Sequence, residues 1–377
     1  MISIPPFADC DFPLIKALRD AGHEVYYIVR LAPFFDKTTL LEFEKIQCKS
    51  GIYPASSYSA FAMWHEWLDL DKVFVSNDSV GKTGWASFRL FLSEWRLIDR
   101  IKPDVVHYVN IPNAFHFPLL LKYKKKSLCV VHDPIPHSGE GSFRDTIKRM
   151  FLPYVCSKFV LLNHLQDEVF CRKWHVSPQR IFHASLGPYT CYTVFGKTQV
   201  PGPPFILFMG RFSPYKGIDF ALKAFNRIRD RFPEVRLVIA GAGPICFDTK
   251  LYSGKNDVEI LHRYLTVKEV ADYVSSAKFV VCPYTDATQS GVIQTSFALC
   301  TPVVATRVGN FSEVVEDGIT GLLVPPRDVE GLSMAFGRLL GDAELLEKMR
   351  ENIAKRNSEG GQSWKAIAGK YVEVYSR

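Results

Sequence analysis

The sequence has no hydrophobic segment long enough to cross a bilayer and no recognisable secretory leader. No apolar run in the 377 residues approaches the roughly 18 to 20 residues that a transmembrane helix needs. The N-terminal segment MISIPPFADCDFP has neither the basic flank nor the long apolar core of a signal peptide. Solenoid repeats and low-complexity tracts are also missing. With 47% hydrophobic and 23% charged residues, the composition predicts a globular, cytoplasmic protein.

The cysteines lack the spacing of a disulfide framework or a metal site. There are nine, an odd number, and none forms a C-x-x-C pair. Several lie in apolar, strand-like runs such as SLCVVHD (127–133) and FVVCPY (279–284). Buried free thiols of this kind fit a reducing compartment.

Strong charge of either sign is also missing, apart from one basic run. The net charge of +7 is mild, and we expect no nucleic-acid partner. The run KYKKK at 122–126 has two readings. It is either a solvated helix end or a surface that attracts an anionic substrate or anionic lipid, which would make the protein peripheral on the cytosolic face of a membrane.

Strand-like apolar runs alternate with amphipathic stretches along the whole chain. Four runs precede the Gly/Pro-rich segment GKTQVPGPPF (196–205), and four follow it. This alternation predicts an α/β protein with two parallel-sheet domains and a cleft between them, because such sheets need helices on both faces. The predicted domains are 1–195 and 196–355. The final helical segment, 356–377, is a candidate to cross back to the first domain.

The segment FILFMGRFSPYKGIDFALKAF places two cations between a strand and a helix. The strand over 205–209 is followed by Gly210, Arg211 and Lys216, and Gly217 opens the helix. An arginine fork and a mobile lysine together suit a diphosphate. The alternative is a surface loop whose cations are merely solvated.

A second strand-to-helix junction lies in PYTDATQSGVIQTSFALCTPVVAT (283–306). The strand AKFVVCPY ends there, and small or polar residues, Ala287 to Gly291, precede an apolar helix. A helix N-terminus carries unpaired backbone N–H groups, so this junction is a candidate anion site.

These blocks, together with LVIAGAGP between them, resemble the second domain of the family 4 retaining glycosyltransferases of the GT-B fold. The resemblance covers residues 203–335 well and extends weakly over the first domain through LRDAGHEVYYIV, IKPDVVHYVN and VVHDPIPH. It implies two Rossmann-like domains facing each other, with a nucleotide-sugar donor on the second and the acceptor on the first. The donor-phosphate Arg and Lys of the family map onto Arg211 and Lys216.

One part of the family pattern is missing. Two glutamates that span the second junction in the family correspond to Ala287 and Thr295 here. The variant ATQSGVI resembles one branch of bacterial polysaccharide glycosyltransferases, in which Ser290, Gly291 and Val292 would keep their backbone N–H groups on the phosphates. Recognition of ribose or sugar hydroxyls would then pass to other side chains, for which the candidates are Asp286, Gln289 and Thr295.

Further site residues are implied by the same resemblance. Arg263 and Tyr264 are candidates for the base side of the donor, unless Tyr264 only packs its loop; Gly210 would approach the nucleotide sugar. In the first domain, His132 and Asp133 follow a strand, and His132 is expected to face the donor sugar. The alternatives are a packed loop histidine, or a metal site that includes His137, which we do not favour because no further ligand lies nearby in sequence.

The sequence thus predicts a metal-independent, retaining glycosyltransferase of the hexosyltransferase type that needs no cofactor. Its catalytic group would be Arg211, Lys216, His132 and Asp133. The donor would be a nucleotide-diphosphate sugar and the acceptor a glycan or lipid-linked saccharide, in cell-surface polysaccharide or glycan biosynthesis. The alternatives are a non-catalytic GT-B-like binding subunit and a nucleotide-sugar epimerase or hydrolase.

Overall fold

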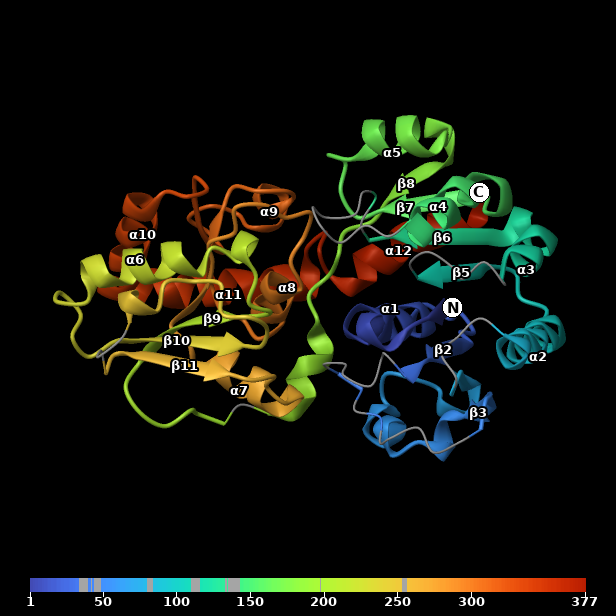
Figure 1. Ribbon diagram of the computed structural model, residues 1–377, viewed down its shortest axis with the longest axis horizontal. Coiled ribbons are helices and arrows are strands. Elements are labelled where there is room, and N and C mark those ends of the chain that lie inside the picture. The colour runs from blue at the N-terminus through green and yellow to red at the C-terminus, as the bar shows by residue number, and fades with distance from the viewer. Residues whose placement is uncertain are drawn as a thin grey trace. The chain divides into compact units, whose positions relative to one another are not determined.

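The computed structural model divides the chain into two compact units, which we call unit 1 and unit 2 (Figure 1). Unit 1 contains residues 1–186 and 364–377, and unit 2 contains residues 187–363. The structure describes residues 1–33, 40–41, 43, 49–79, 84–109, 116–132, 134, 143–196, 198–252 and 256–377, with side chains from 146 onward in the segment that begins at 143.

Unit 1 is built on an eight-stranded sheet in the order β3-β4-β2-β1-β5-β6-β7-β8. All pairings are parallel except that of β3 with β4. The strands are β1 (Ile2–Ser3), β2 (Tyr27–Leu31), β3 (Gly51–Pro54), β4 (Val73–Asn77), β5 (Val106–Val109), β6 (Ser127–Val131), β7 (Lys158–Leu161) and β8 (Ile181–His183). The helices are α1 (Ala8–Asp20), α2 (Trp85–Ile101), α3 (Phe117–Lys122), α4 (Phe143–Val155), α5 (Asp167–Trp174) and α12 (Trp364–Ser376).

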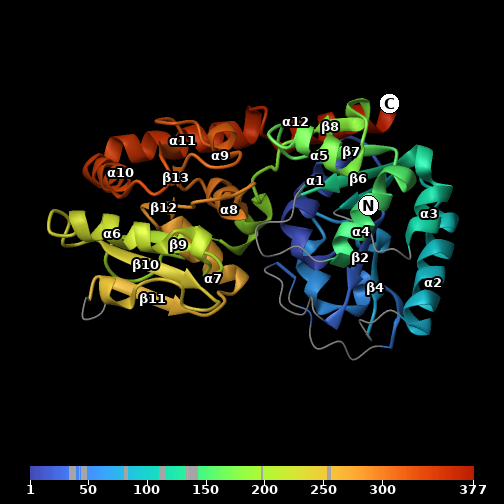
Figure 2. The ribbon, with the colours of Figure 1, turned by 45° about the horizontal axis from the view of Figure 1, so that its top comes forward.

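Unit 2 is built on a six-stranded, wholly parallel sheet in the order β11-β10-β9-β12-β13-β14. The strands are β9 (Phe205–Met209), β10 (Arg236–Gly241), β11 (Val258–His262), β12 (Phe279–Cys282), β13 (Val303–Thr306) and β14 (Gly321–Val324). The helices are α6 (Ile218–Ile228), α7 (Val267–Ser276), α8 (Gly291–Ala298), α9 (Phe311–Val314), α10 (Val329–Gly341) and α11 (Ala343–Glu359) (Figure 2). All four residues of β12, β13 and β14 are buried, as parallel strands covered on both faces must be.

The strand order places a topological switch point in unit 2. The chain moves outward from β9 through β10 to β11, and then returns to start β12 on the other side of β9. Strands β9 and β12 are paired, with Leu207 opposite Val280. In open α/β sheets, ligands bind outside the carboxyl ends of two such strands. Both predicted junctions, 210–217 and 283–291, follow these two strands.

The α/β architecture with two parallel-dominated sheets is therefore confirmed. The boundaries of the units differ from those predicted from the sequence. The second domain was predicted over 196–355, whereas unit 2 begins at Gly187 and ends at Ser363. The short helix over Thr190–Phe195, before the predicted linker, packs on α7 and α8 of unit 2. Helix α12 packs against α1 and belongs to unit 1. None of the helices in the described part of the chain combines the length and apolarity that a bilayer span requires.

Candidate functional site

The two strand-to-helix junctions at the switch point, 210–217 and 283–291, are in close contact at Gly217, where a larger residue would not fit. Gly217 has φ +69°, and a Cβ built on it would lie 2.0 Å from the Pro283 carbonyl oxygen. The Thr285 backbone N–H donates to the Tyr215 carbonyl at 2.8 Å, which ties the same two loops together. Gly217 therefore sets the distance between the loop after β9 and the loop after β12.

Gly210 brings the first loop close to the helix of the second. It has φ +135°, and a Cβ built on it would lie 3.8 Å from the Val292 side chain in the first turn of α8. Its own N–H donates to the Ala240 carbonyl at 3.0 Å. The predicted residues Gly210 and Val292, which are far apart in sequence, are thus neighbours.

The two cations of the first junction differ in their surroundings. Arg211 is exposed, whereas Lys216 is partly buried. The Lys216 ammonium lies 3.8 Å from the centroid of the Tyr284 ring and 5.2 Å from that of Tyr215. A cation over an aromatic face is stabilised by the ring quadrupole. The structure therefore packs the lysine against two aromatic rings, whereas the arginine is at an exposed position.

Two buried groups beneath Lys216 remain neutral. Burial raises the pKa of the Cys282 thiol to about 12, although the nearby positive charge of Lys216 acts in the opposite direction. Burial also raises the pKa of the Tyr284 phenol well above its usual range. Neither group therefore neutralises Lys216 at neutral pH.

The second junction presents the N-terminus of α8. Ser290 is the N-cap, and its hydroxyl accepts from the Ile293 N–H at 3.4 Å. The first N–H groups of a helix have no acceptor within it, so those of Gly291 and Val292 face outward from this end. A Cβ on Gly291 would lie 3.2 Å from the Tyr189 ring, so a larger residue there would press on that ring.

The positions that correspond to the two missing glutamates are buried. Ala287 is 8% exposed, and its carbonyl lies 2.0 Å from where a Cβ on Gly309 would be. Thr295 is 4% exposed, and its hydroxyl donates to the Gly291 carbonyl at 2.9 Å within α8. The structure therefore gives the Thr295 hydroxyl a partner in its own helix. Of the other candidates for hydroxyl recognition, Asp286 is exposed and Gln289 is partly buried.

The loop after β11 is held by an ion pair. The Arg263 guanidinium donates two hydrogen bonds to the Glu269 carboxylate, with N–O distances of 2.9 and 2.6 Å. Glu269 also closes the capping box with Thr266 at the start of α7. The hydrogen bonds from Arg263 hold the pKa of Glu269 down at about 2. Tyr264 is 67% exposed and so does not pack its loop.

Three tyrosines of this region had no local signal in the sequence. Tyr189 lies before the predicted linker, Tyr215 sits between the two cations, and Tyr284 follows a strand. Tyr189 is joined to α8 because its N–H donates to the Gln294 carbonyl at 3.2 Å. Aromatic residues are common in any core, so only their positions beside Gly291 and Lys216 single them out.

In unit 1, His132 lies directly after β6, at the carboxyl edge of the sheet. It is 6% exposed, and its ring stacks on Phe7 with centroids 4.1 Å apart. Asp133 and His137 lie outside the described residues. The role of His132 toward a donor sugar stays a prediction.

One group of three side chains in the described part of unit 1 has metal-ligand chemistry. Ligand atoms of His164, Asp167 and His183 all lie within 4.8 Å of one another. His183 already pairs with Asp167 at 2.8 Å, and the His164 and His183 rings lie with centroids 3.7 Å apart at an interplanar angle of 33°. These three side chains supply fewer than the four ligands of a tetrahedral structural site.

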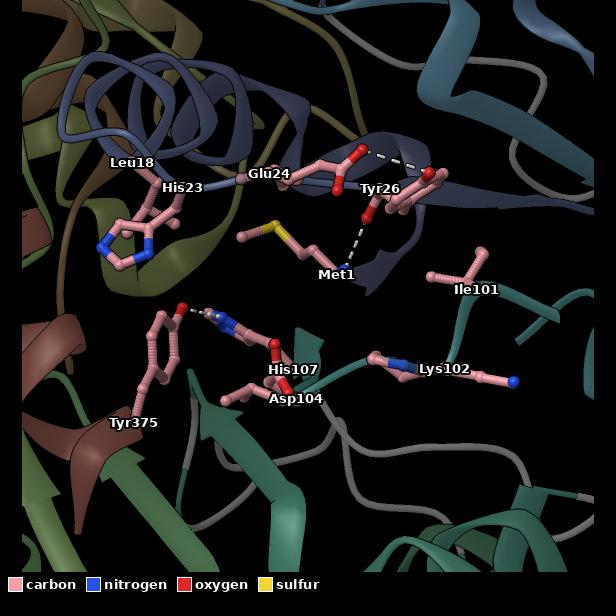
Figure 3. A pocket seen from close by; sticks show the side chains of 13 residues that line it. Met1, Leu18, His23, Glu24, Tyr26, Ile101, Lys102, Asp104, His107 and Tyr375 are labelled. Atoms are coloured by element: carbon pink, nitrogen blue, oxygen red, sulfur yellow. Dashed lines mark hydrogen bonds between the residues drawn. The ribbon is translucent and has the colours of Figure 1, made fainter. Parts of the chain in front are cut away.

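The pocket in Figure 3 lies at the wrong edge of the unit 1 sheet for a ligand site of this fold. It has a volume of about 290 Å³ and is lined by Met1, Tyr26 and Val105, which directly precede β1, β2 and β5. Burial lowers the pKa of His107 in its wall to about 3, so this imidazole is neutral and shares a 2.7 Å hydrogen bond with the Tyr375 hydroxyl. Ligands of parallel sheets bind at the carboxyl edge instead.

Comparison with solved structures identifies the fold class first. Sucrose-phosphate synthase from Thermosynechococcus elongatus matches with a TM-score of 0.66 at 16% identity, over 100% of this chain and 98% of that one. HepE of Anabaena, solved in complex with UDP, matches with a TM-score of 0.65 at 13% identity, over 100% and 99% of the two chains. The chain therefore has the GT-B fold.

The sequence of unit 2 carries the family match. Residues 203–342 match the family described as glycosyl transferases group 1. The chain is 30% identical over 154 residues to the alpha-D-kanosaminyltransferase of Streptomyces kanamyceticus, covering 40% of each protein. It is 32% identical over 193 residues to the D-inositol 3-phosphate glycosyltransferase of an Arthrobacter species, covering 47% of this chain and 43% of the relative. These matches span less than half the length of either relative.

Proposed function

We propose that the protein is a glycosyltransferase that moves a sugar from a nucleotide-diphosphate donor to a hydroxyl acceptor. The observation that carries this proposal is that the loop containing Arg211 and Lys216 and the loop leading to the N-terminus of α8 follow the two paired strands of the switch point and contact each other. The family of residues 203–342 and the names of the relatives support the same activity. HepE, which shares the fold, was solved with UDP-glucose, a donor of this class.

The chemistry of the proposed reaction explains why positive charge is needed there. The bond between the anomeric carbon and the diphosphate oxygen breaks, and its electron pair goes to the diphosphate. The acceptor oxygen forms the new bond, and its proton passes to a phosphate oxygen. Arg211, Lys216 and the N–H groups of Gly291 and Val292 would stabilise the charge that develops on the leaving group.

The finer features of the proposal rest on the resemblance of the sequence to the retaining branch. They are retention at the anomeric carbon, transfer of a hexose, and independence of a metal, whose role the two cations and the helix end would fill. The acceptor would be a glycan or a lipid-linked saccharide in cell-surface polysaccharide biosynthesis. The matched domain, residues 203–342, lies in unit 2, so we expect it to define the donor end of the reaction.

Incubation with a panel of UDP-, GDP- and ADP-sugars tests the activity. We expect one donor to be consumed by transfer to an added acceptor or by slow hydrolysis, with release of the nucleoside diphosphate. Formation of an epimer of the donor sugar would identify an epimerase instead. Tight binding of a donor with no turnover under any acceptor would identify the non-catalytic subunit.

The missing glutamates are the one observation that favours the non-catalytic alternative. If the site has decayed, the double substitution Ala287→Glu/Thr295→Glu should raise donor affinity or turnover. We expect weaker donor binding, because the variant adds two carboxylates at buried positions beside a diphosphate. Thr295→Val is the control, because it removes only the hydroxyl bond to Gly291. Improved turnover in the double variant would show that ATQSGVI is not a working alternative.

A further inference from the structure

Helix α4 of unit 1 carries an apolar stripe that faces away from the core. Four side chains on it are exposed: Ile147 by 39%, Met150 by 58%, Phe151 by 52% and Tyr154 by 65%. Their spacing of three, four and seven residues from Ile147 places them on one face of the helix. The opposite face is buried through Leu152 and Val155, which belong to the core cluster of unit 1. Helix α4 is therefore apolar on both sides, although packing on the core of unit 1 requires only one apolar side.

The stripe continues onto α3. The rings of Phe117 and Phe151 lie with centroids 6.2 Å apart, and α3 packs against α4. Leu121 lies one helical turn beyond Phe117, on the same side of α3, and is 56% exposed. The outer sides of α3 and α4 thus form one apolar surface, which we call the α3–α4 surface; it consists of the half-buried Phe117 and the exposed Leu121, Ile147, Met150, Phe151 and Tyr154.

Lysines border this surface where α3 ends. Lys122 closes α3, and Lys124, Lys125 and Lys126 follow it directly. Lys122 pairs with Asp99 at 2.6 Å, and Lys126 donates to the Pro103 carbonyl at 3.0 Å. The nearby carboxylate of Asp99 is therefore already neutralised. Lys124 and Lys125 are exposed and add positive charge beside the apolar side chains.

We propose that the α3–α4 surface docks the protein on an anionic membrane. Large exposed apolar patches on a soluble protein mark interaction sites, and aromatic side chains with a polar tip, such as Tyr154, suit the interface between headgroups and acyl chains. Adjacent lysines add attraction to anionic lipid. A second copy of the chain fits less well, because a symmetric contact would bring the same lysine rims together. Docking requires no nucleotide sugar, so it stands independently of the proposed transferase activity.

Flotation with lipid vesicles tests the docking surface. The full chain is mixed with vesicles of phosphatidylcholine alone, or of phosphatidylcholine with phosphatidylglycerol. We expect binding to the anionic vesicles that weakens as salt is added. Met150→Ser/Phe151→Ser should lower the partition coefficient by about tenfold or more, because two apolar side chains no longer leave water. Met334→Ser on α10 is the matched control, since Met334 is 67% exposed but lies in unit 2, and it should bind like the wild type.

Charge reversal tests the lysine rim separately. Lys124→Glu/Lys125→Glu should lower binding to anionic vesicles by about fivefold or more for each lysine. Lys348→Glu/Lys355→Glu, at exposed positions of α11, makes the same change in net charge away from the surface and should have little effect. Circular dichroism checks that each variant is folded.

Three results would overturn the proposal. The first is a wild-type protein that floats with neither kind of vesicle. The second is equal binding to neutral and anionic vesicles. The third is self-association of the wild type that Met150→Ser/Phe151→Ser abolishes, with no vesicle binding, which would assign the surface to a second copy of the chain.

Discussion

The two units differ in the polar groups that they bury. Among the described residues, every buried Asp, Glu, His or Arg side chain lies in unit 1, whereas the buried polar side chains of unit 2 are those of Ser, Thr, Asn and Gln. The buried ionisable side chains of unit 1 are Asp11, Glu94, His107, His116, His132 and Arg149.

This difference suggests that charge stabilises the fold in unit 1 and serves ligand binding in unit 2. Unit 1 pairs its buried Glu94 with Arg30 and His116 of the same unit, and the buried ionisable groups make its stability depend on pH. Unit 2 contains no buried carboxylate in its described part that could neutralise Arg211 and Lys216. The positive charge of Arg211 and Lys216 would attract a doubly charged diphosphate. The following experiments test this division.

The largest effect is expected from removing the central carboxylate of unit 1. Glu94 is 2% exposed and accepts from Arg30, His116 and Ser76. Burial alone would raise its pKa, but its contacts with His116, Arg30 and Ser76 hold the pKa at about 2. Burial lowers the pKa of His116, so Arg30 is the partner that stays charged at neutral pH. Glu94→Ala should lower the free energy of unfolding by about 3 to 5 kcal/mol, because Arg30 loses its counter-charge and His116 loses its hydrogen-bond partner.

A matched exposed pair provides the control for Glu94. Glu168 is 81% exposed and pairs with Arg172 on α5. Glu168→Ala should change the free energy of unfolding by less than about 1 kcal/mol, since exposed ion pairs contribute little. Urea denaturation measures both variants. Equal losses in the two would contradict the claim that unit 1 depends on its buried charges.

The second effect tests the packing of the two junctions in unit 2. Gly217→Ala would place a Cβ 2.0 Å from the Pro283 carbonyl, so the loops must move apart. We expect a loss of stability of about 3 kcal/mol, together with weaker nucleotide binding. Gly318→Ala is the control, because Gly318 also has a positive φ, of +79°, but its Cβ would meet nothing within 4 Å. It should cost only about 1 kcal/mol. A similar loss in both variants would show that backbone strain, and not the contact between the loops, sets the cost.

The third effect is a pH dependence that belongs to unit 1. Asp11 is 2% exposed, and burial raises its pKa to about 7, against the hydrogen bonds from Ser3 and Tyr27. Because the folded-state pKa is raised, the stability from protonated Asp11 is fully present below its unfolded pKa near 3.8 and is lost as the pH rises through about 7. From pH 5 to pH 8 the wild type should therefore lose about 2 kcal/mol that Asp11→Asn does not lose. Denaturation of both proteins at the two pH values measures the difference, and parallel pH profiles would contradict it.

The sequence predicted the elements of unit 2 well because their signals are local. The runs FILFMG, RLVIAG and KFVVCPY contain β9, β10 and β12, since strands buried on both faces read as continuous apolar segments. Glycines and cations at the strand ends marked both junctions. No local pattern predicts contacts between residues about 70 positions apart. The contact of Gly217 with Pro283 and the position of Lys216 over Tyr284 are contacts of this kind.

Unit 1 was harder to predict for the same reason. Glu94, Arg30 and His116 come from three separate segments, and each alone reads as an ordinary polar residue. The predicted linker at 196–205 followed Gly and Pro content, whereas unit 2 begins at Gly187 because the segment around Tyr189 packs on α8. At the other end, Asn357 donates to the Phe297 carbonyl at 2.7 Å, so α11 stays with unit 2 beyond residue 355.

The central claim is that unit 2 binds a nucleoside diphosphate through Arg211 and Lys216, and calorimetric titration with UDP, GDP and ADP tests it most directly. For the diphosphate that binds, Arg211→Ala should raise the dissociation constant by about 10- to 150-fold, because a charge-assisted hydrogen bond contributes about 1.5 to 3 kcal/mol. Arg211→Lys should restore part of the affinity, since a point charge replaces the fork. Arg338→Ala, an exposed arginine on α10, should bind like the wild type. Equal dissociation constants for the wild type and a folded Arg211→Ala would contradict the account.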